Sequence, residues 1–136
     1  MGGHNCLGTG TAAADSSVSG NVGTLTNGPT WTTSGRVGGA LSFDGTDDYV
    51  SVANEATYDI TGSITVAAWI KVNAFDKAYQ SILTKGDSWK LQRNNLTNTL
   101  SLASMARIFC RAVLLMLFSS GSSFIARSFS PFFCMS

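Results

Sequence analysis

The sequence has few charged residues. Only 12 % of its 136 residues are charged, whereas a typical soluble domain has about a quarter. Nine Lys and Arg residues stand against eight Asp and Glu residues, which gives a net charge of +1 at pH 7. This balance offers no electrostatic attraction to nucleic acid or to an anionic membrane. We therefore expect no nucleic-acid partner.

Residue types that commonly carry catalysis are also scarce. The chain has one histidine, His4, and one glutamate, Glu55. A retaining glycosidase needs two carboxyl groups about 5 to 5.5 Å apart, and no run of alternating acids supplies them from one strand. Asp47 and Asp48 are adjacent, so within a strand their side chains would point to opposite faces. We therefore predict that the protein is not an enzyme and has no catalytic residues.

Cysteine usage and hydrophobicity exclude further classes. Cys6, Cys110 and Cys134 are an odd number without CxxC spacing, which indicates neither a disulfide framework nor a zinc site. No apolar run reaches the roughly 18 to 20 residues that span a bilayer. The first ten residues (MGGHNCLGTG) have neither the basic nor the apolar segment of a signal peptide.

Composition divides the chain into two unlike parts. All eight acidic residues lie at or before Asp87, whereas residues 104–136 contain three Arg, no acidic residue and six of the eight Phe. This composition is typical of a shifted reading frame, which is the interpretation that we favour for the tail. A helix that binds a membrane surface or a partner, and an ordinary end of the fold, are the alternatives. Residues 108–118 have the composition of a short helix.

Before residue 104, apolar and polar residues alternate as in β-strands. The strongest pattern covers residues 63–72, where every second residue from Ile64 to Val72 is apolar. Residues 39–44 and 48–52 also alternate around a short link that contains glycine, which predicts a β-hairpin. Further strands are expected over residues 78–85, 88–93 and 98–103, whereas residues 1–38 are expected to be mostly loop. Strands at this spacing predict an antiparallel β-sandwich.

A set of short motifs covers about two thirds of the chain. The most specific are GRVGGALSFDG (35–45) with DDYV (47–50), and SITVAAWIK (63–71). The others are GTAAADSS (10–17), SGN (19–21), GTL (23–25), GPTW (28–31) and ILTKGD (82–87). In these motifs, residues 10–103 resemble the laminin G-like jelly-roll family of the concanavalin A-like lectin and glucanase superfamily.

The resemblance implies an all-β fold, an antiparallel jelly-roll β-sandwich. Residues 1–9 occupy the place of the family's first strand and are expected to be degraded or disordered. Residues 10–103 are a partial jelly-roll domain, and the atypical tail 104–136 is irregular or a short helix. An incomplete sandwich leaves apolar faces and strand edges uncovered. We therefore expect aggregation or self-association of the isolated chain.

The resemblance also implies a function. Members of the family are mostly accessory modules of secreted or surface proteins and bind glycans or proteins. The chain is therefore expected to be a fragment of an extracellular, non-catalytic carbohydrate- or protein-binding module. A structural spacer or adhesion domain without a small ligand is one alternative, and a gene fragment without function is another.

Two kinds of site residue follow from the resemblance. Many members hold a structural calcium ion, Ca2+, and here Asp15 and Asn21 are the best candidate ligands. Calcium prefers carboxylate, amide and carbonyl oxygens, and Asp44, Asp47 and Asp48 are weaker candidates. The alternative for these acids is hydrogen bonding within Asx-turns.

Exposed aromatic side chains are the candidate platforms for a glycan. Trp69 and Tyr49 are the predicted ligand-binding residues. Trp69 lies opposite the apolar face of its strand, where it can meet a ligand. The alternative is that these rings pack in the core or support loops.

Overall fold

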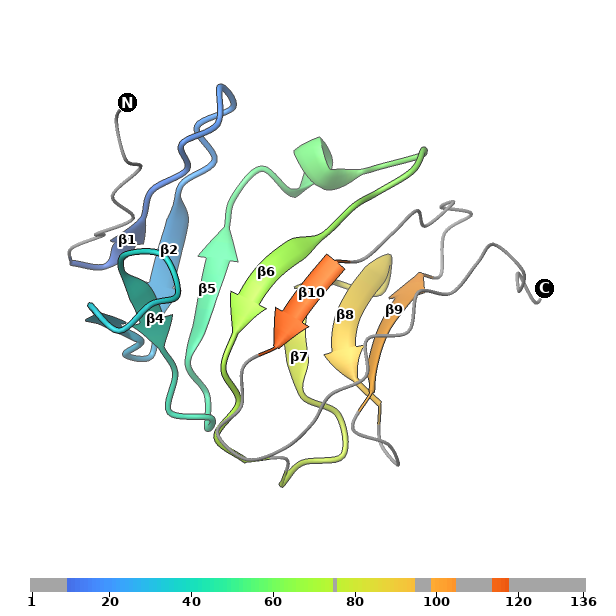
Figure 1. Cartoon of the computed structure of the whole chain (residues 1–136). Helices are drawn as coiled ribbons and strands as arrows, with labels where there is room; N and C mark the ends of the chain where they lie inside the picture. The colour runs from blue at the N-terminus through green and yellow to red at the C-terminus, as the bar shows by residue number, and fades with distance from the viewer. Residues whose placement is uncertain (1–9, 75, 95–98, 105–113, 118–136) are drawn as a thin grey trace. The chain divides into compact units, whose positions relative to one another are not determined.

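The computed structural model describes residues 10–74, 76–94, 99–104 and 114–117 (Figure 1). Within these ranges the chain is mostly β-strand, and its single helix is the short 3-10 helix η1 (Glu55–Tyr58). All strand pairs but one are antiparallel. The all-β prediction is therefore confirmed as antiparallel strands with almost no helix. The chain divides into two units, Met1–Ala56 and Thr57–Ser136.

The first unit contains a three-stranded antiparallel sheet. Its strand order is β1 (Ala12–Ala13), β2 (Gly23–Thr26) and β5 (Tyr49–Val52). Leu25 lies opposite Val50. The side chains of the two neighbouring pairs, Thr24 with Ser51 and Thr26 with Tyr49, point to the other face of the sheet. One face of β2 and β5 is therefore apolar, whereas the other carries Thr24, Thr26, Ser51 and Tyr49.

Close packing requires glycine at the start of β2. A Cβ atom at Gly23 would lie 2.6 Å from Cγ1 of Val50 and 3.4 Å from Cβ of Ala13. The first distance is shorter than real contacts allow, so the missing side chain is what lets β1 and β5 flank β2 at this point.

A two-stranded sheet completes the first unit. β3 (Thr30–Thr32) pairs antiparallel with β4 (Ala40–Ser42), and Trp31 lies opposite Leu41. β1, β2 and β3 lie within residues 1–38, which the sequence predicted to be mostly loop. These strands have only two to four residues, which is too short for a period-two pattern to stand out in the sequence.

The predicted hairpin between residues 39–44 and 48–52 is wrong. β4 pairs with β3, and β5 pairs with β2. Between β4 and β5, the N–H of Thr46 donates to Oδ1 of Asp44, and the N–H of Asp44 donates to Oδ2 of Asp48. These bonds stabilise the turn, while β4 and β5 form their ladders with β3 and β2.

The second unit contains a three-stranded antiparallel meander. β7 (Ser81–Lys85), β8 (Trp89–Arg93) and β9 (Leu100–Ser104) pair in chain order. The turn between β7 and β8 is closed by a hydrogen bond from the N–H of Ser88 to the carbonyl of Lys85, at 2.9 Å. These strands confirm the predicted elements over residues 78–103, although each is shorter or slightly shifted.

The remaining strand pair in the second unit is parallel. β10 (Leu114–Leu117) lies beside β6 (Ala67–Ile70), with Leu114 opposite Ala67 and Leu117 opposite Ile70. The short helix predicted for residues 108–118 is therefore wrong over β10, and its other residues lie outside the described ranges. A short apolar run suits a strand or a helix equally well, and here the edge of β6 supplies hydrogen-bonding partners for a strand.

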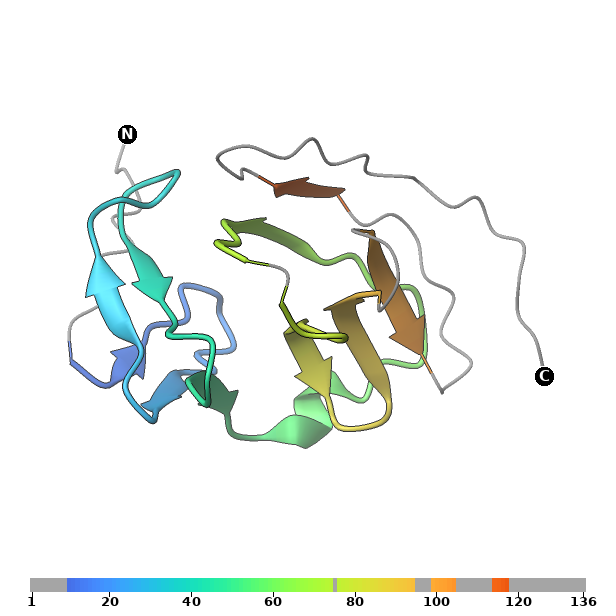
Figure 2. The same ribbon diagram turned by 90° about the horizontal axis from the view of Figure 1, so that it is seen from below.

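The core of the second unit lies between two layers. Figure 2 shows β6 and β10 on one side and the sheet of β7, β8 and β9 on the other. Ile64 and Val66, just before β6, meet Trp89 and Leu91 of β8 in one buried cluster. From Ile64 to Val72, buried or partly buried residues alternate with exposed ones. The predicted period-two strand face is thus confirmed, although the regular ladder covers only β6.

Complete burial is confined to the second unit among the large apolar residues that the structure describes. In the first unit, Leu25, Trp31, Leu41 and Val50 are only partly buried, and Val52 is 41 % exposed.

Among the described residues, no helix has the length and hydrophobicity needed to cross a membrane.

We expect Leu91→Ala to lower the free energy of unfolding of the second unit by about 3 kcal/mol, because it leaves a cavity in a packed core. Leu83 is the matched control, since it pairs with Leu91 across the hairpin but is 43 % exposed. Leu83→Ala should cost less than about 1 kcal/mol. Urea unfolding followed by tryptophan fluorescence measures both, and equal losses would contradict the assignment of the core.

Candidate binding site

The exposed face of β6 carries a tryptophan. Trp69 is 49 % exposed, and its strand neighbours Ala68 and Ile70 turn toward the interior. The preceding outward residue, Ala67, has a small side chain. The opposite side of this chain segment is anchored in the core through Ile64 and Val66. The ring therefore has the exposure that the sequence predicted and is held by a buried strand face.

Tyr49 is the second predicted ligand-binding residue. It begins β5, lies opposite Thr26 on the polar face of its sheet, and is 50 % exposed. Tyr49 belongs to the first unit and Trp69 to the second. Each ring is therefore a separate candidate platform.

The other two tryptophans have structural positions. Trp89 is 5 % exposed in the core, and within the part of the chain that the structure describes its Nε1 has no hydrogen-bond partner. Trp31 is partly buried, and its Nε1 donates to the carbonyl of Gly10 at 3.1 Å. Trp89 and Trp31 therefore fit the alternative interpretation, in which aromatic rings pack in the core or support loops.

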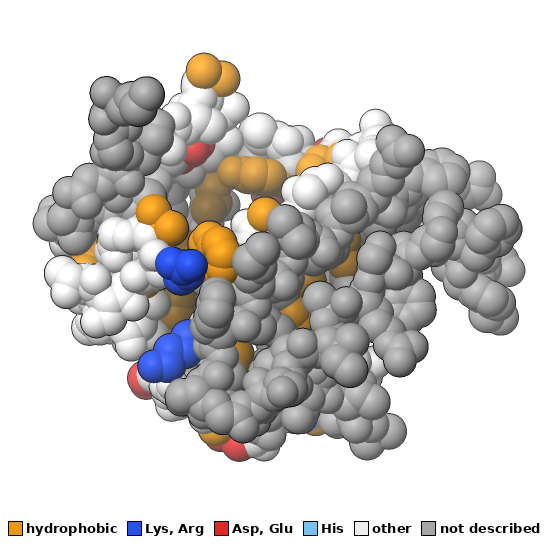
Figure 3. All heavy atoms as spheres, in the orientation of Figure 1, with side chains coloured by type: hydrophobic (Ala, Val, Ile, Leu, Met, Phe, Trp, Pro, Cys, Tyr) orange, Lys and Arg blue, Asp and Glu red, His pale blue; other side chains and the backbone are white. Residues whose placement is uncertain are grey.

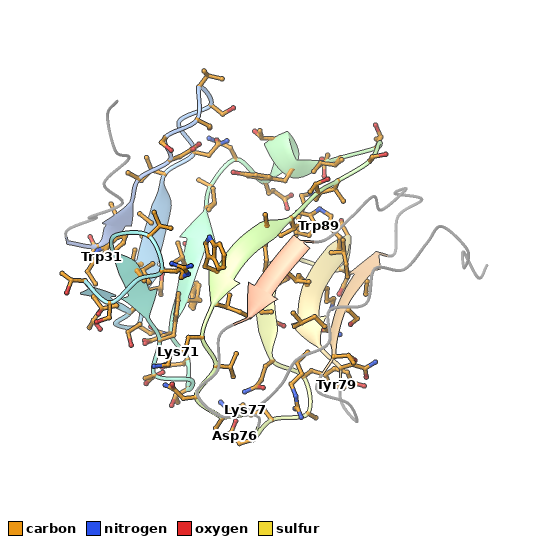
Figure 4. All side chains as sticks on the ribbon, viewed as in Figure 1. Trp31, Lys71, Asp76, Lys77, Tyr79 and Trp89 are labelled. Atoms are coloured by element: carbon orange, nitrogen blue, oxygen red, sulfur yellow. The ribbon has the colours of Figure 1, made fainter. Side chains whose placement is uncertain are left out.

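The loop after β6 carries features that the strand pattern did not reveal. Figure 4 shows Lys71 and Lys77 toward the end of the unit at which β6 runs out. An Arg93 guanidinium nitrogen donates to the carbonyl of Lys77, which ties the loop to β8. Tyr79 follows in this loop and is 58 % exposed. The alternation in SITVAAWIK places Lys71 on the same outward face as Trp69, and this was the signal available in the sequence.

Asp15 organises its own loop. One carboxylate oxygen accepts a hydrogen bond from the N–H of Ser17, and the other accepts from the Ser17 hydroxyl and from the N–H of Asn21, all at 2.7 Å. The Ser17 hydroxyl, followed by these two amides, lowers the pKa of Asp15 below its usual 3.8. These are the bonds of the Asx-turn alternative. Calcium ligation by Asp15 and Asn21 stays a prediction.

Three further carboxylates gather in the turn before β5. Asp44, Asp47 and Asp48 each have an oxygen within 4.8 Å of the others. The sequence predicted that Asp47 and Asp48 would point apart within a strand, but both precede β5, so strand alternation does not apply to them. The N–H bonds accepted by Asp44 and Asp48 stabilise the turn, and exposed acidic groups of this kind are common without an ion.

In the orientation of Figure 3, apolar side chains and Lys or Arg side chains both reach the surface.

Comparison with models of known protein families found no match. Comparisons with curated proteins and with solved structures found none either.

We expect Ser17→Ala to raise the pKa of Asp15, because the Ser17 hydroxyl makes the largest contribution to lowering it. The adjacent, exposed Ser16 provides the matched control, and Ser16→Ala should leave the pKa of Asp15 unchanged. Carbon-13 NMR of the Asp15 carboxyl group during a pH titration measures both. Equal shifts in the two variants would contradict the hydrogen-bond assignment.

The sign of the effect on stability follows from the lowered pKa. A carboxylate whose pKa is lower in the folded state stabilises the fold above its unfolded pKa, and this contribution is lost as the pH falls through the folded value. The Asp15 loop should therefore loosen below about pH 4.

Adding calcium during the same NMR measurement separates the two roles of Asp15. Ligation by Asp15 and Asn21 predicts calcium-dependent shifts at both residues, whereas an Asx-turn alone predicts none.

Proposed function

We propose that the chain is part of a non-catalytic, carbohydrate-binding accessory module with a laminin G-like jelly-roll architecture, which acts in a secreted or cell-surface protein. The motifs between residues 10 and 87 support the family, and the short antiparallel strands are compatible with a jelly roll. The two-layer packing of the second unit supports a sandwich, because each sheet buries one face against the other.

The observation that carries the proposal is the exposed indole of Trp69 on β6. Aromatic rings combine a large apolar face with a polar edge, and the face suits the C–H groups on one side of a sugar ring. Because the inner side of this segment is buried, the ring is already in place before a ligand arrives. Such preorganisation lowers the entropic cost of binding.

The arrangement of the acids supports binding rather than hydrolysis. Asp44 and Asp48 accept backbone hydrogen bonds within their own turn. A glycosidase pair would instead face a shared substrate from two sides of the scissile bond. Tyr49, on the polar face of its sheet, is a second candidate platform and belongs to the first unit.

We expect Trp69→Ala to weaken glycan binding by about tenfold, which corresponds to about 1.4 kcal/mol. The measurement is a glycan array with the full chain, followed by titration of the best ligand. Tyr79→Ala is the control, since it removes an exposed ring of the same unit that lies outside β6. Circular dichroism of each variant checks that the fold is retained.

Two outcomes would count against the proposal. If the folded chain binds no glycan, a structural spacer is the better interpretation. If the two variants lose affinity equally, Trp69 is not the platform.

A further inference from the structure

The short link between β2 and β3 contains the only asparagine–glycine pair of the chain, Asn27 and Gly28. Both residues are exposed, whereas Pro29, which follows them, is buried and anchors the end of the link. Their φ angles are positive, 66° at Asn27 and 115° at Gly28. Asparagine and glycine adopt a backbone of positive φ with less strain than most residues. The turn geometry thus accounts for these two residue types standing side by side at an exposed point of the first unit.

An asparagine that is followed by glycine can lose its side-chain amide without an enzyme. The backbone nitrogen of Gly28 adds to Cγ of Asn27, the Cγ–Nδ2 bond breaks, and the Gly28 N–H proton leaves with that nitrogen as ammonia. The product is a five-membered succinimide ring. Water then opens the ring at Cγ, which gives aspartate, or at the backbone carbonyl, which gives isoaspartate. Glycine favours ring closure because it has no Cβ to crowd its nitrogen.

The side chain of Asn27 joins two turns of the first unit. Its Nδ2 donates a hydrogen bond to the backbone carbonyl of Asp47 at 3.0 Å, so the β2–β3 link is attached to the turn that precedes β5. An ionised carboxylate in its place has no hydrogen to donate. Conversion therefore removes this hydrogen bond, and isoaspartate also inserts a side-chain carbon into the main chain of the link.

Conversion also adds a negative charge where carboxylates already gather. A Cβ atom at Gly28 would lie 3.6 Å from Oδ1 of Asp48, so the link lies against this carboxylate. Oxygens of Asp44, Asp47 and Asp48 lie within 4.8 Å of one another. Like charges at such separations repel, and added salt screens the repulsion. The amide of Asn27 avoids this cost, because it is neutral and donates to the turn.

We infer that Asn27 is a site of spontaneous deamidation, and that its conversion releases the β2–β3 link from the turn between β4 and β5 and loosens the first unit. This inference does not depend on the proposed function. Asn54 provides a matched comparison within the chain. It is exposed and has a φ angle of 61°, but Glu55 follows it instead of glycine. The following residue therefore distinguishes the two asparagines.

The first test measures deamidation in the unmodified full chain. The chain is kept in mildly alkaline buffer, which favours loss of the proton from the attacking backbone nitrogen, and samples are digested at intervals for mass spectrometry. Fragment ions locate the gain in mass that accompanies replacement of –NH2 by –OH. We expect conversion at Asn27 to be about tenfold faster than at Asn54, because the Cβ atom of Glu55 obstructs ring closure. Equal rates at the two positions, or no conversion at Asn27, would overturn the inference.

The second test measures the consequence of conversion with Asn27→Asp and Asn54→Asp, which introduce the same charge at exposed residues of positive φ. Hydrogen exchange followed by mass spectrometry reports on residues 44–48, with β8 as the reference in the second unit. Asn27→Asp should accelerate exchange over residues 44–48 about tenfold at low salt, and by less at high salt because the repulsion is screened. Asn54→Asp should leave this exchange unchanged.

Two results of the second test contradict the release of the link. One is unchanged exchange over residues 44–48 in Asn27→Asp, and the other is equal acceleration in both variants. Circular dichroism checks that each variant retains its strands. The deamidation rates from the first test need no variant, so they decide whether Asn27 is a modification site even where a substituted chain fails to fold.

Discussion

Packing between the inner side of the β6 segment and β8 is the constraint on which the second unit depends. Ile64 and Val66 on one layer meet Trp89 and Leu91 on the other, and partly buried residues from β7, β9 and the η1 region close around them. Burial of a side chain of this size typically contributes about 1.5 to 3 kcal/mol. This small cluster therefore fixes the separation and the facing of both layers.

The same alternation that builds this core also builds the candidate site. Because side chains of a strand alternate between its faces, a segment that buries Ile64 and Val66 must present Thr65, Ala67 and Trp69 outward. The stability of the core and the exposure of the Trp69 indole therefore both result from one period-two pattern. The candidate site needs no separate scaffold, because the segment that carries Trp69 is held by the core cluster behind it.

Sequence reasoning succeeded where one face of a strand is buried. The alternation from Ile64 to Val72 and the strands β7 and β8 were predictable, and the same alternation placed Trp69 opposite the apolar face. It failed at the pairing of β4 and β5, because β4 pairs with β3 and β5 pairs with β2, while the carboxylates of Asp44 and Asp48 accept hydrogen bonds that shape the turn between them. The sequence named Asp44, Asp47 and Asp48 together as weaker calcium candidates, but it applied strand alternation to Asp47 and Asp48, which precede the strand. Neither β10 nor its parallel pairing follows from local pattern, because a short apolar run does not specify its partner.

The parallel pairing of β6 with β10 has a consequence for the order of folding. The β7–β8–β9 meander joins neighbours in the chain, whereas the β6–β10 ladder joins Ala67 to Leu114. Loop-closure entropy must be paid before distant contacts form, so the meander is expected to assemble first and the parallel ladder last. During that interval one edge of β6 is without its final neighbour. The rate at which β10 docks therefore sets how long a nascent chain is open to pairing with another.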